Sequence, residues 1–354
     1  MKKKLSFLLL FCLSIFGCET DFEVNAPWKE TMVIYGLLDQ SKAVQIIKIN
    51  KAFLGEGDAN LFAQNTDSIN YDPKDLKVVV YETSSNGSIL DSLIFHDSII
   101  SNKKPGDFST TKNIVYVSYQ KLDSNYVYKL SVKNLKTGNI ATASTSLLQR
   151  IRYSKPSPDP NNTTISFVLS ASSPSTNGSY SDLTTSWTTK PNAKTYQTNL
   201  RFYYLEKNLS TNIIEEKYVD WLQSAKQSQS ISGNELIAQS ISGLGFYQLL
   251  GSEIPINNNV FRYASKIVLT MTVGSDELNN YININSPSSD LNQEKPLYTN
   301  VNNGLGIFSS RTSSSITKFL CDNSVPSKLC DAGRPSLKEL VEGKYTYQLK
   351  FKYN

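Results

Sequence analysis

Histidine is nearly absent from this chain, and other chemically active residues are few. The 354 residues include one His, four Cys and three Met. A single imidazole excludes a metal site built from several histidines, and it argues against Ser–His or Cys–His catalysis, in which that one ring would have to be the base. No run of Lys and Arg forms a nucleic-acid footprint. We therefore expect a binding or structural protein, not an enzyme, with no cofactor and no metal.

Long apolar runs are also missing downstream of residue 16, so no later segment is expected to span a bilayer. The hydrophobic share of 39%, with 11% aromatic residues, is enough to build packed cores. The length predicts about two domains.

The N-terminal residues have the pattern of an export signal. Residues 1–4 read Met–Lys–Lys–Lys, residues 5–16 are mostly apolar, and Gly17 and Cys18 follow. This end resembles a bacterial lipobox, which implies that residues 1–17 are a signal peptide and that Cys18 is acylated. The alternative is an ordinary signal peptide with an unrelated Cys. Removal of residues 1–17 takes away three Lys and no acid, which leaves 33 basic and 31 acidic residues, a net charge near +2.

The residues after Cys18 are short and acidic: Glu19, Thr20, Asp21, Phe22 and Glu23. They resemble the lipoprotein export signal of Bacteroidota, which implies display on the outer face of the outer membrane. Their alternative role is that of a solvated linker. In both cases residues 18–28 form the tether.

Two further cysteines, Cys321 and Cys330, remain once Cys12 leaves with the leader and Cys18 is acylated. Two cysteines in an exported protein predict a disulfide. By loop entropy, a bridge over about ten residues stabilises the fold by roughly 2.5–3 kcal/mol. The alternative, a zinc site, lacks partner ligands.

Short β-rich runs separated by turn residues predict a sandwich over residues 29–150. Within the run 126–132, Tyr126, Tyr128, Leu130 and Val132 alternate with outward residues such as Lys129. The residues before it resemble the tyrosine corner of fibronectin-like and immunoglobulin-like sandwiches, which implies a structural role for Tyr126. The expected strands are 32–38, 44–49, 76–81, 89–95, 114–119, 126–132 and 140–147.

A larger β domain with helical insertions is predicted for residues 151–354, after a Pro-rich segment around residues 154–162. Residues 232–251 have roughly helical spacing, interrupted by glycines, and residues 276–285 predict a second short helix. Ser336 and Glu339 fit a capping box at the start of a third. The expected strands are 165–169, 183–188, 195–205, 262–273, 306–310 and 345–353.

Residues 296–308, in particular Thr299–Asn300 and Gly304–Leu305–Gly306–Ile307–Phe308, resemble a Thr-Asn-aliphatic-x-Gly-Gly-x-Gly-x-Phe stretch in a family of Bacteroidota surface lipoproteins. The resemblance implies an N-terminal fibronectin-like sandwich, a larger β domain and a link to TonB-dependent outer-membrane receptors. It carries no catalytic residues. From the residues themselves, Gly304 and Gly306 predict positive φ or close backbone approach, with Ile307 and Phe308 returning to the core. The alternative for this stretch is a ligand loop.

Other candidate sites are weaker. His96 beside Asp97 is expected to be a surface residue at a strand end. Ser68, Ser92 and Ser98 follow Asp and precede an aliphatic residue, which resembles the O-glycosylation sequon of Bacteroidota. Aromatic residues that could be core, or could instead bind sugars or a partner, are Trp28, Tyr203, Tyr204, Tyr218, Trp221, Phe246 and Tyr247.

These observations predict a mainly β, non-enzymatic lipoprotein on the cell surface. Its expected role is that of an accessory subunit of an outer-membrane β-barrel, either a TonB-dependent receptor or a barrel-assembly or secretion machine. A second hypothesis is a free-standing glycan or peptide binder. A third is a hydrolase, which needs convergent carboxylates; Glu215 and Glu216 are adjacent, so on a strand they would face opposite sides.

Overall fold

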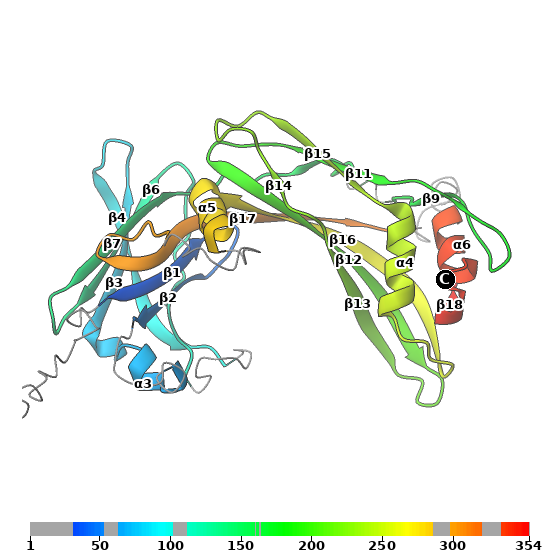
Figure 1. Cartoon of the computed structure of the whole chain (residues 1–354), viewed down its shortest axis with the longest axis horizontal. Helices are drawn as coiled ribbons and strands as arrows, with labels where there is room; N and C mark the ends of the chain where they lie inside the picture. Colours follow the sequence, from blue (N-terminus) through cyan, green and yellow to red (C-terminus); the bar gives the residue numbers. More distant parts are fainter. Residues whose placement is uncertain are drawn as a thin grey trace, which may run out of the picture.

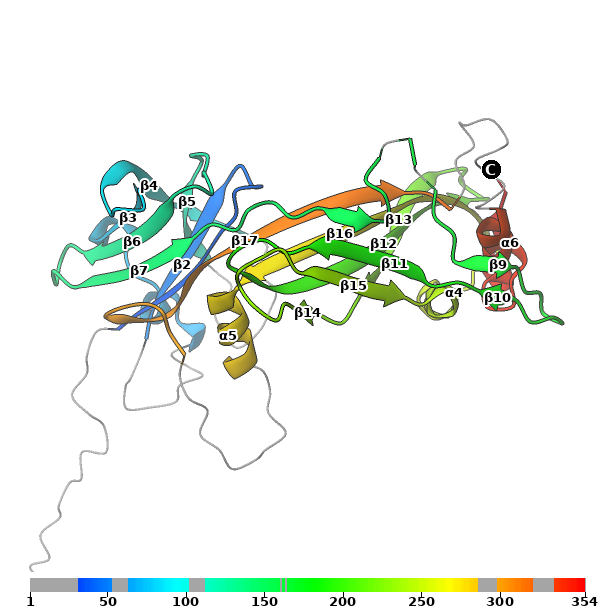
Figure 2. The same ribbon diagram turned by 90° about the horizontal axis from the view of Figure 1, so that it is seen from above.

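The computed structural model describes residues 31–52, 63–101, 112–159, 161–162, 164–285, 298–320 and 334–353. These residues form a mainly β protein with short helices, which confirms the expected sandwich-like fold class. Two bodies are visible, joined by long strands (Figures 1 and 2). Each body encloses its own cluster of buried apolar side chains.

The first body is a sandwich of short antiparallel strands. Its strands are β1 (Met32–Leu38), β2 (Gln45–Lys51), β3 (Leu76–Thr83), β4 (Ile89–Ile99), β5 (Ile114–Ser118), β6 (Val127–Asn134) and β7 (Ile140–Ser146). They match the seven strands expected from the sequence. Strand β4 changes sheets along its length, because residues up to Phe95 pair with β3 and residues from His96 pair with β5. The short helix α3 (Thr66–Ile69) and the turn Pro73–Asp75 precede β3.

The tyrosine corner exists, but Tyr128 makes it and not Tyr126. The Tyr128 side chain is fully buried, and its hydroxyl accepts the Asp123 N–H at 2.8 Å and donates to Glu82 Oε2 at 2.8 Å. Tyr126 is only partly buried against the same core. The corner falls on Tyr128 because that hydroxyl reaches back over five residues to the turn while its ring fills the sandwich interior. The expected alternation is confirmed, since Tyr128, Leu130 and Val132 are buried and Lys129 is exposed.

The second body is built on two long strands, β12 (Ala193–Asn208) and β16 (Val260–Ser275), whose 16 residues each exceed the expected bounds. Even-numbered residues of β12 from Tyr196 to Tyr204 are buried and odd-numbered ones are partly exposed. A smaller sheet and two helices cover the buried face. The remaining strands and helices are β8 (Tyr153–Lys155), β9 (Val168–Ser170), β10 (Ser179–Tyr180), β11 (Leu183–Thr188), β13 (Ile214–Leu222), β14 (Lys226–Gln227), β15 (Leu236–Ile241), β18 (Phe351–Lys352), α4 (Gly243–Glu253), α5 (Asp276–Asn285) and α6 (Arg334–Glu342).

Strand β17 (Gly304–Lys318) belongs to both bodies. Its residues Gly304 to Ser310 run parallel to β1, and its residues Arg311 to Lys318 run antiparallel to β16. The two main sheets are therefore one hydrogen-bonded series in the order β13-β12-β16-β17-β1-β2-β5-β4-β3-β6-β7. Phe308 and Val301 lie in the core of the first body, although they come from the far end of the chain.

Four residues of the motif that leads into and begins β17 have a clear structural role. The Asn300 side chain donates to the Phe308 carbonyl at 2.7 Å and accepts the Phe308 N–H at 2.9 Å. Its amide thus makes the two hydrogen bonds that a neighbouring strand would make to Phe308. Gly306 has φ +100°, and a Cβ there would lie 2.1 Å from the Ile34 carbonyl oxygen. Ile307 and Phe308 are buried. The expectation of positive φ, close approach and re-entry to the core is confirmed.

Three sequence expectations are wrong in the second body. Residues 232–251 do not form a broken helix, because Leu236–Ile241 is strand β15, paired along its length with β11, and only α4 is helical. The C-terminal strand shrinks to the two residues of β18, because Tyr347–Leu349 forms a helical turn and Lys350 has φ +62°. The helix expected over residues 276–285 is confirmed as α5.

The third wrong expectation is the capping box at Ser336, because the side chains of Ser336 and Glu339 form hydrogen bonds to other segments of the chain. Ser336 lies inside α6, and its Oγ accepts the Phe167 N–H at 2.9 Å. The fully buried Glu339 carboxylate accepts from Ser172 Oγ at 2.7 Å and from the Tyr180 hydroxyl at 2.8 Å. These bonds hold α6 against the β9–β10 region, which no pattern within the helix could indicate.

The glycine at position 306 provides a test of this junction. We expect Gly306→Ala to lower the free energy of unfolding by roughly 3 kcal/mol, because it combines a strained positive φ with a backbone clash. Gly138→Ala is the control: Gly138 has φ +78° but nothing within 4 Å of a Cβ, so we expect a loss of about 1 kcal/mol. Urea unfolding measures both, and equal losses would contradict the close approach of β17 to β1.

Candidate functional site

Several residues singled out from the sequence lie outside the described residues: Cys18, Glu19, Thr20, Asp21, Phe22, Glu23, Trp28, Cys321 and Cys330. The lipidation, the export signal and the disulfide therefore stay predictions. Among the candidate glycosylation residues, Ser92 is exposed, while Ser68 and Ser98 are partly buried. His96 is exposed on β4. Over the described residues, no group of three or more His, Cys, Asp or Glu is placed to hold a metal ion.

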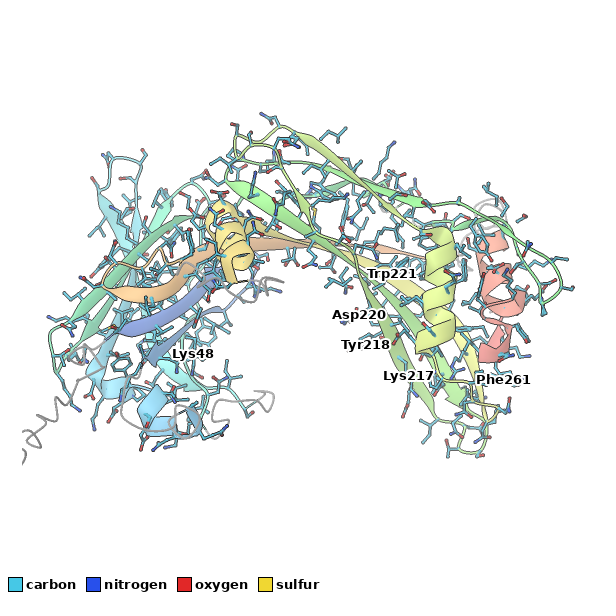
Figure 3. All side chains as sticks on the ribbon, viewed as in Figure 1. Lys48, Lys217, Tyr218, Asp220, Trp221 and Phe261 are labelled. Atoms are coloured by element: carbon cyan, nitrogen blue, oxygen red, sulfur yellow. The ribbon has the colours of Figure 1, made fainter. Side chains whose placement is uncertain are left out.

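The candidate aromatic residues divide between core and surface. Tyr204, Phe246 and Tyr247 are buried in the second core. Trp221 is partly buried and packs against Gly245 of α4, where an added Cβ would lie 3.1 Å from its ring. Tyr203 and Tyr218 lie opposite each other on β12 and β13, with ring centroids 5.9 Å apart, and Tyr218 is 53% exposed. Both lie on the face of the sheet opposite to Phe202, which packs against Phe246 of α4; Figure 3 labels Tyr218 on β13.

Two cations cover these tyrosine rings. The Arg201 guanidinium lies 4.0 Å from the centroid of the Tyr218 ring, and Lys266 Nζ lies 4.6 Å from the centroid of the Tyr203 ring. Cation–π contacts of this kind contribute about 0.5–1 kcal/mol at exposed sites. One face of each ring is thereby occupied by a side chain of the same sheet.

Carboxylates hold both cations in place. Arg201 donates to Asp220 through Nε at 2.7 Å and Nη2 at 2.6 Å, a bidentate pair, and Lys266 lies 3.3 Å from Glu216 Oε1. The hydrogen bonds to Asp220 raise the pKa of Arg201 further, and the same bonds lower the pKa of Asp220. We call Arg201, Tyr203, Glu216, Tyr218, Asp220 and Lys266 the tyrosine–cation face. The charges of this face balance, because Arg201 pairs with Asp220 and Lys266 pairs with Glu216.

Sequence reasoning found the two tyrosines of this face and missed its four charged residues. Strand β13 was not expected, although Ile214, Glu216, Tyr218, Asp220 and Leu222 share one side at a period of two. That alternation was the available signal. The expectation that Glu215 and Glu216 face opposite sides is confirmed, because Glu215 lies 3.7 Å from Lys217 while Glu216 pairs with Lys266.

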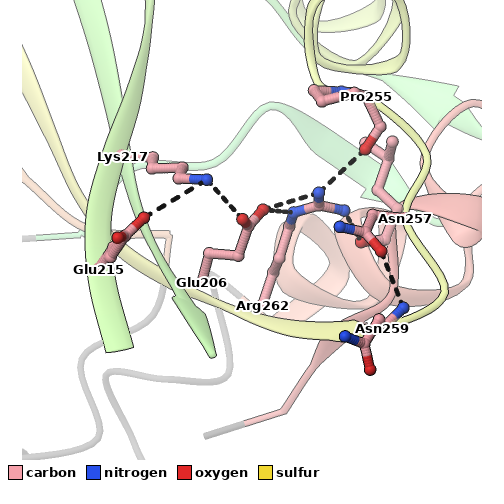
Figure 4. A network of polar contacts seen from close by, with 8 residues as sticks. Glu206, Glu215, Lys217, Pro255, Asn257, Asn259 and Arg262 are labelled. Carbon is pink, nitrogen blue, oxygen red and sulfur yellow. Dashed lines mark hydrogen bonds and ion pairs between the residues drawn. The ribbon is translucent and has the colours of Figure 1, made fainter. Parts of the chain in front are cut away.

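A second charged cluster, at the far end of β12, is structural. The Arg262 side chain is fully buried, and it donates to Glu206 Oε2 at 2.8 Å and to the carbonyl oxygens of Leu349 and Pro255 at 2.5 and 2.9 Å (Figure 4). Lys217 Nζ reaches Glu206 Oε1 at 2.5 Å. Arg262 thus connects β12, the segment after α4 and the C-terminal turn. Each of the three guanidinium nitrogens has an acceptor, and the side chain is fully buried, so Arg262 is not presented to a ligand.

Comparisons with known proteins identify no relative. No protein-family model and no curated protein matches the chain. Among solved structures, the chain is similar to the C-terminal globular domain of an oligosaccharyltransferase from Pyrococcus abyssi, with 9% identity and a TM-score of 0.23 over 71% of this chain and 49% of that one. It is also similar to trypsin-activated α2-macroglobulin from Escherichia coli, with 8% identity and a TM-score of 0.18 over 84% of this chain and 16% of that one.

The chain therefore spans about half the length of the first of these structures and far less of the second. At such TM-scores neither likeness carries an argument.

Within the described residues, none of the helices has the length and hydrophobicity needed to cross a membrane.

The Arg262 cluster predicts a pH dependence of stability. Burial alone would raise the pKa of Glu206, but hydrogen bonds from Lys217 and Arg262 outweigh it and hold that pKa below the ordinary 4.5. Because the folded-state pKa is depressed, the contribution of Glu206 is complete above pH 4.5 and is lost as the pH falls through the lower folded-state pKa.

We expect Glu206→Gln to destabilise the protein by about 3–5 kcal/mol at pH 7, since it leaves the Arg262 charge buried and unpaired. The difference from wild type should shrink in acid, where the wild-type carboxyl is protonated as well. Denaturant unfolding at several pH values measures this. The control is Glu215→Gln, whose side chain is 64% exposed and should change stability by less than about 0.5 kcal/mol. A difference in unfolding free energy between wild type and Glu206→Gln that stays the same at every pH would contradict this role of the Glu206 carboxylate.

Proposed function

We propose that this chain is a non-enzymatic lipoprotein, acylated at Cys18 and displayed on the outer face of the outer membrane as an accessory subunit of a β-barrel complex. The lipobox ending at Gly17–Cys18, the acidic residues after it and the resemblance of residues 296–308 support this proposal. The barrel is a TonB-dependent receptor, as the resemblance implies, or a barrel-assembly or secretion machine.

The tyrosine–cation face is the observation that carries the docking part of this proposal. Tyr and Arg are the residue types that most often dominate the energy of protein interfaces. Here Tyr218 is exposed and Arg201 is held rigid by its bidentate pair with Asp220, so that little side-chain entropy would be lost on binding. Leu222, 62% exposed on the same side of β13, extends the surface with an apolar contact.

A protein partner fits this face better than a glycan. Sugar stacking needs an open aromatic face, and Arg201 occupies one face of the Tyr218 ring while Lys266 occupies one face of the Tyr203 ring. The charged pairs on the rim, Arg201–Asp220 and Glu216–Lys266, can instead bond to polar groups of a protein surface. A free-standing glycan or peptide binder remains the competing hypothesis, to be separated by experiment.

The tether gives this role its physical basis. Two or more acyl chains hold a protein stably on a membrane, because each buried methylene contributes about 0.8 kcal/mol. Confinement to the membrane plane raises the effective concentration of the docking face at a neighbouring barrel. A modest intrinsic affinity is then sufficient for a stable complex.

The anchor can be tested separately from the docking face. We expect wild-type protein to incorporate labelled palmitate and to be degraded by protease added to intact cells. Cys18→Ser should abolish labelling, because it removes the only thiol at the predicted processing site. A Cys12→Ser variant is the control and should be labelled normally. Labelling that survives Cys18→Ser, or protection in intact cells with degradation after lysis, would contradict the proposal.

The docking face predicts stoichiometric recovery of one β-barrel protein when the tagged lipoprotein is purified in gentle detergent. Tyr218→Ala and Arg201→Ala should each weaken the complex at least about tenfold, since both are candidate hot-spot residues. Tyr119→Ala is the matched control, because Tyr119 is 73% exposed on the other body, and it should have no effect. Mass spectrometry and titration of the purified partner provide the measurements.

Two results would overturn the docking part. Recovery of the lipoprotein alone, with saturable binding to a glycan array, would favour the free-standing binder. Equal losses for Tyr218→Ala and Tyr119→Ala would show that the partner docks elsewhere. Unchanged thermal midpoints would exclude misfolding as the cause of any loss.

A further inference from the structure

A hollow of about 240 Å³ lies where the two bodies meet. Its walls come from β1, from the turn that follows it, from β2 and from Arg311 at the point where β17 passes to the second sheet. It is smaller than the roughly 300–1,000 Å³ of pockets that hold drug-sized ligands, so a group the size of one or two side chains fits. No residue of the tyrosine–cation face lines it.

The turn that forms one wall is fixed by its own hydrogen bonds. The buried Gln45 side chain accepts the Asp39 N–H at 2.9 Å and donates to the carbonyl oxygens of Asp39 and Lys42 at 2.9 and 3.1 Å. Asp39 Oδ1 accepts from the Ser41 N–H at 2.9 Å and from Ser41 Oγ at 2.6 Å. Gln40 donates to the Leu148 carbonyl at 2.7 Å, which ties the turn to the second body. The backbone position of Lys42 is therefore set before any ligand arrives.

Two cations at this hollow have spare hydrogen-bond donors. Arg311 Nε lies 3.9 Å from Asp39 Oδ2, beyond hydrogen-bond distance, and the guanidinium is 46% exposed. Among the residues that the structure describes, none accepts a hydrogen bond from the side chain of Arg311 or of Lys42. Because Asp39 is the one acidic residue of the lining, the hollow carries a net positive charge.

The rest of the lining is apolar. Tyr35 of β1 and Ile46 of β2 are each 42% exposed, and the partly buried Leu37 and Val44 lie beside them. The Tyr35 ring is held by an edge contact with Tyr281 of α5, with centroids 6.3 Å apart and planes at 77°. The hollow thus presents an apolar wall next to two exposed cations, of which Arg311 has a long ion pair with Asp39 and Lys42 has no acceptor among the described residues.

We infer that this hollow binds a peptide segment in which a carboxylate lies beside an apolar side chain. The planar Arg311 guanidinium suits a carboxylate, and Lys42 adds a second positive charge. The apolar group would cover Tyr35 and Ile46 and remove their exposed surface from water. A free phosphate ion would use the cations but would leave this wall exposed, so it fits the hollow less well. The carboxylate belongs to an acidic side chain or to a chain terminus.

The test uses the full chain carrying Cys18→Ser, so that no acyl chain competes for the apolar wall. The probes are N-acetylphenylalanine, its neutral amide, acetate and inorganic phosphate, with binding followed by backbone amide NMR shifts. We expect N-acetylphenylalanine to shift the amides of Val44 and Ile46 saturably. The amide, acetate and phosphate should each bind at least about tenfold more weakly, because each lacks the charge or the apolar body.

Variants assign the two halves of the site. Lys42→Gln combined with Arg311→Gln, and separately Ile46→Ser, should each weaken N-acetylphenylalanine at least about tenfold. The control is Lys129→Gln, an exposed lysine on β6 in the other sheet of the first body, which should leave binding unchanged. A peptide with a free C-terminal Phe and an amidated peptide with an internal Glu–Leu pair then distinguish a terminus from a side chain.

The inference is overturned if N-acetylphenylalanine and its amide bind equally, since the cations would then play no part. It is also overturned if phosphate binds as tightly as N-acetylphenylalanine, or if no probe gives a saturable shift. All the substituted side chains are at least partly exposed, so unchanged thermal midpoints should accompany any loss of binding.

Discussion

Strand β17 is shared by two hydrophobic cores, and the rest of the structure depends on this sharing. Its first half completes the sheet of the first body beside β1, and its second half completes the sheet of the second body beside β16. Backbone hydrogen bonds therefore run without a break from β13 to β7. Phe308, fully buried, fills the first core from a position more than 250 residues after β1 begins. The bodies cannot be exchanged or separated as independent modules without breaking that ladder.

Charge serves two different purposes in this molecule, and burial decides between them. Arg262 and Glu339 are fully buried: Arg262 fixes the C-terminal turn to the long sheet through Glu206 and the Leu349 carbonyl, and Glu339 fixes α6 to the β9–β10 region through Ser172. Arg201 and Lys266 form equally specific pairs, but at the solvent-accessible face, where tyrosines lie under them. At the junction, Arg311 and Lys42 have apolar neighbours instead of close partners. The first arrangement serves stability. For the second we propose protein recognition, and for the third the binding of a peptide carboxylate that lies beside an apolar side chain.

The sequence predicted those elements whose periodicity is local and clear. The seven strands of the first body and helix α5 agree with expectation, because alternation or helical spacing persists over each of them. Residues 236–241 were expected to be helical but form strand β15. A short apolar run fits a helix or a strand, and pairing with β11 selects the strand. Ser336 and Glu339 have the spacing of a capping box. Their side chains instead accept hydrogen bonds from Phe167 and Ser172, about 170 residues earlier in the chain. Tyr203 and Tyr218 could be named as candidates, but not the cations that cover them.

The sequence by itself determined the β class and the special backbone at Gly304–Gly306, and it predicts the export pattern at Cys18, because each depends on residue types within a few positions. Tertiary structure alone decided that β17 serves two sheets, that Tyr128 forms the corner, and which aromatics reach the surface. Those outcomes depend on pairings between residues far apart in the chain, and a local sequence pattern does not indicate which strand will pair with which. The junction hollow is the extreme case, since the pairing of β17 with β1 brings Arg311 beside residues that lie more than 260 positions earlier in the chain.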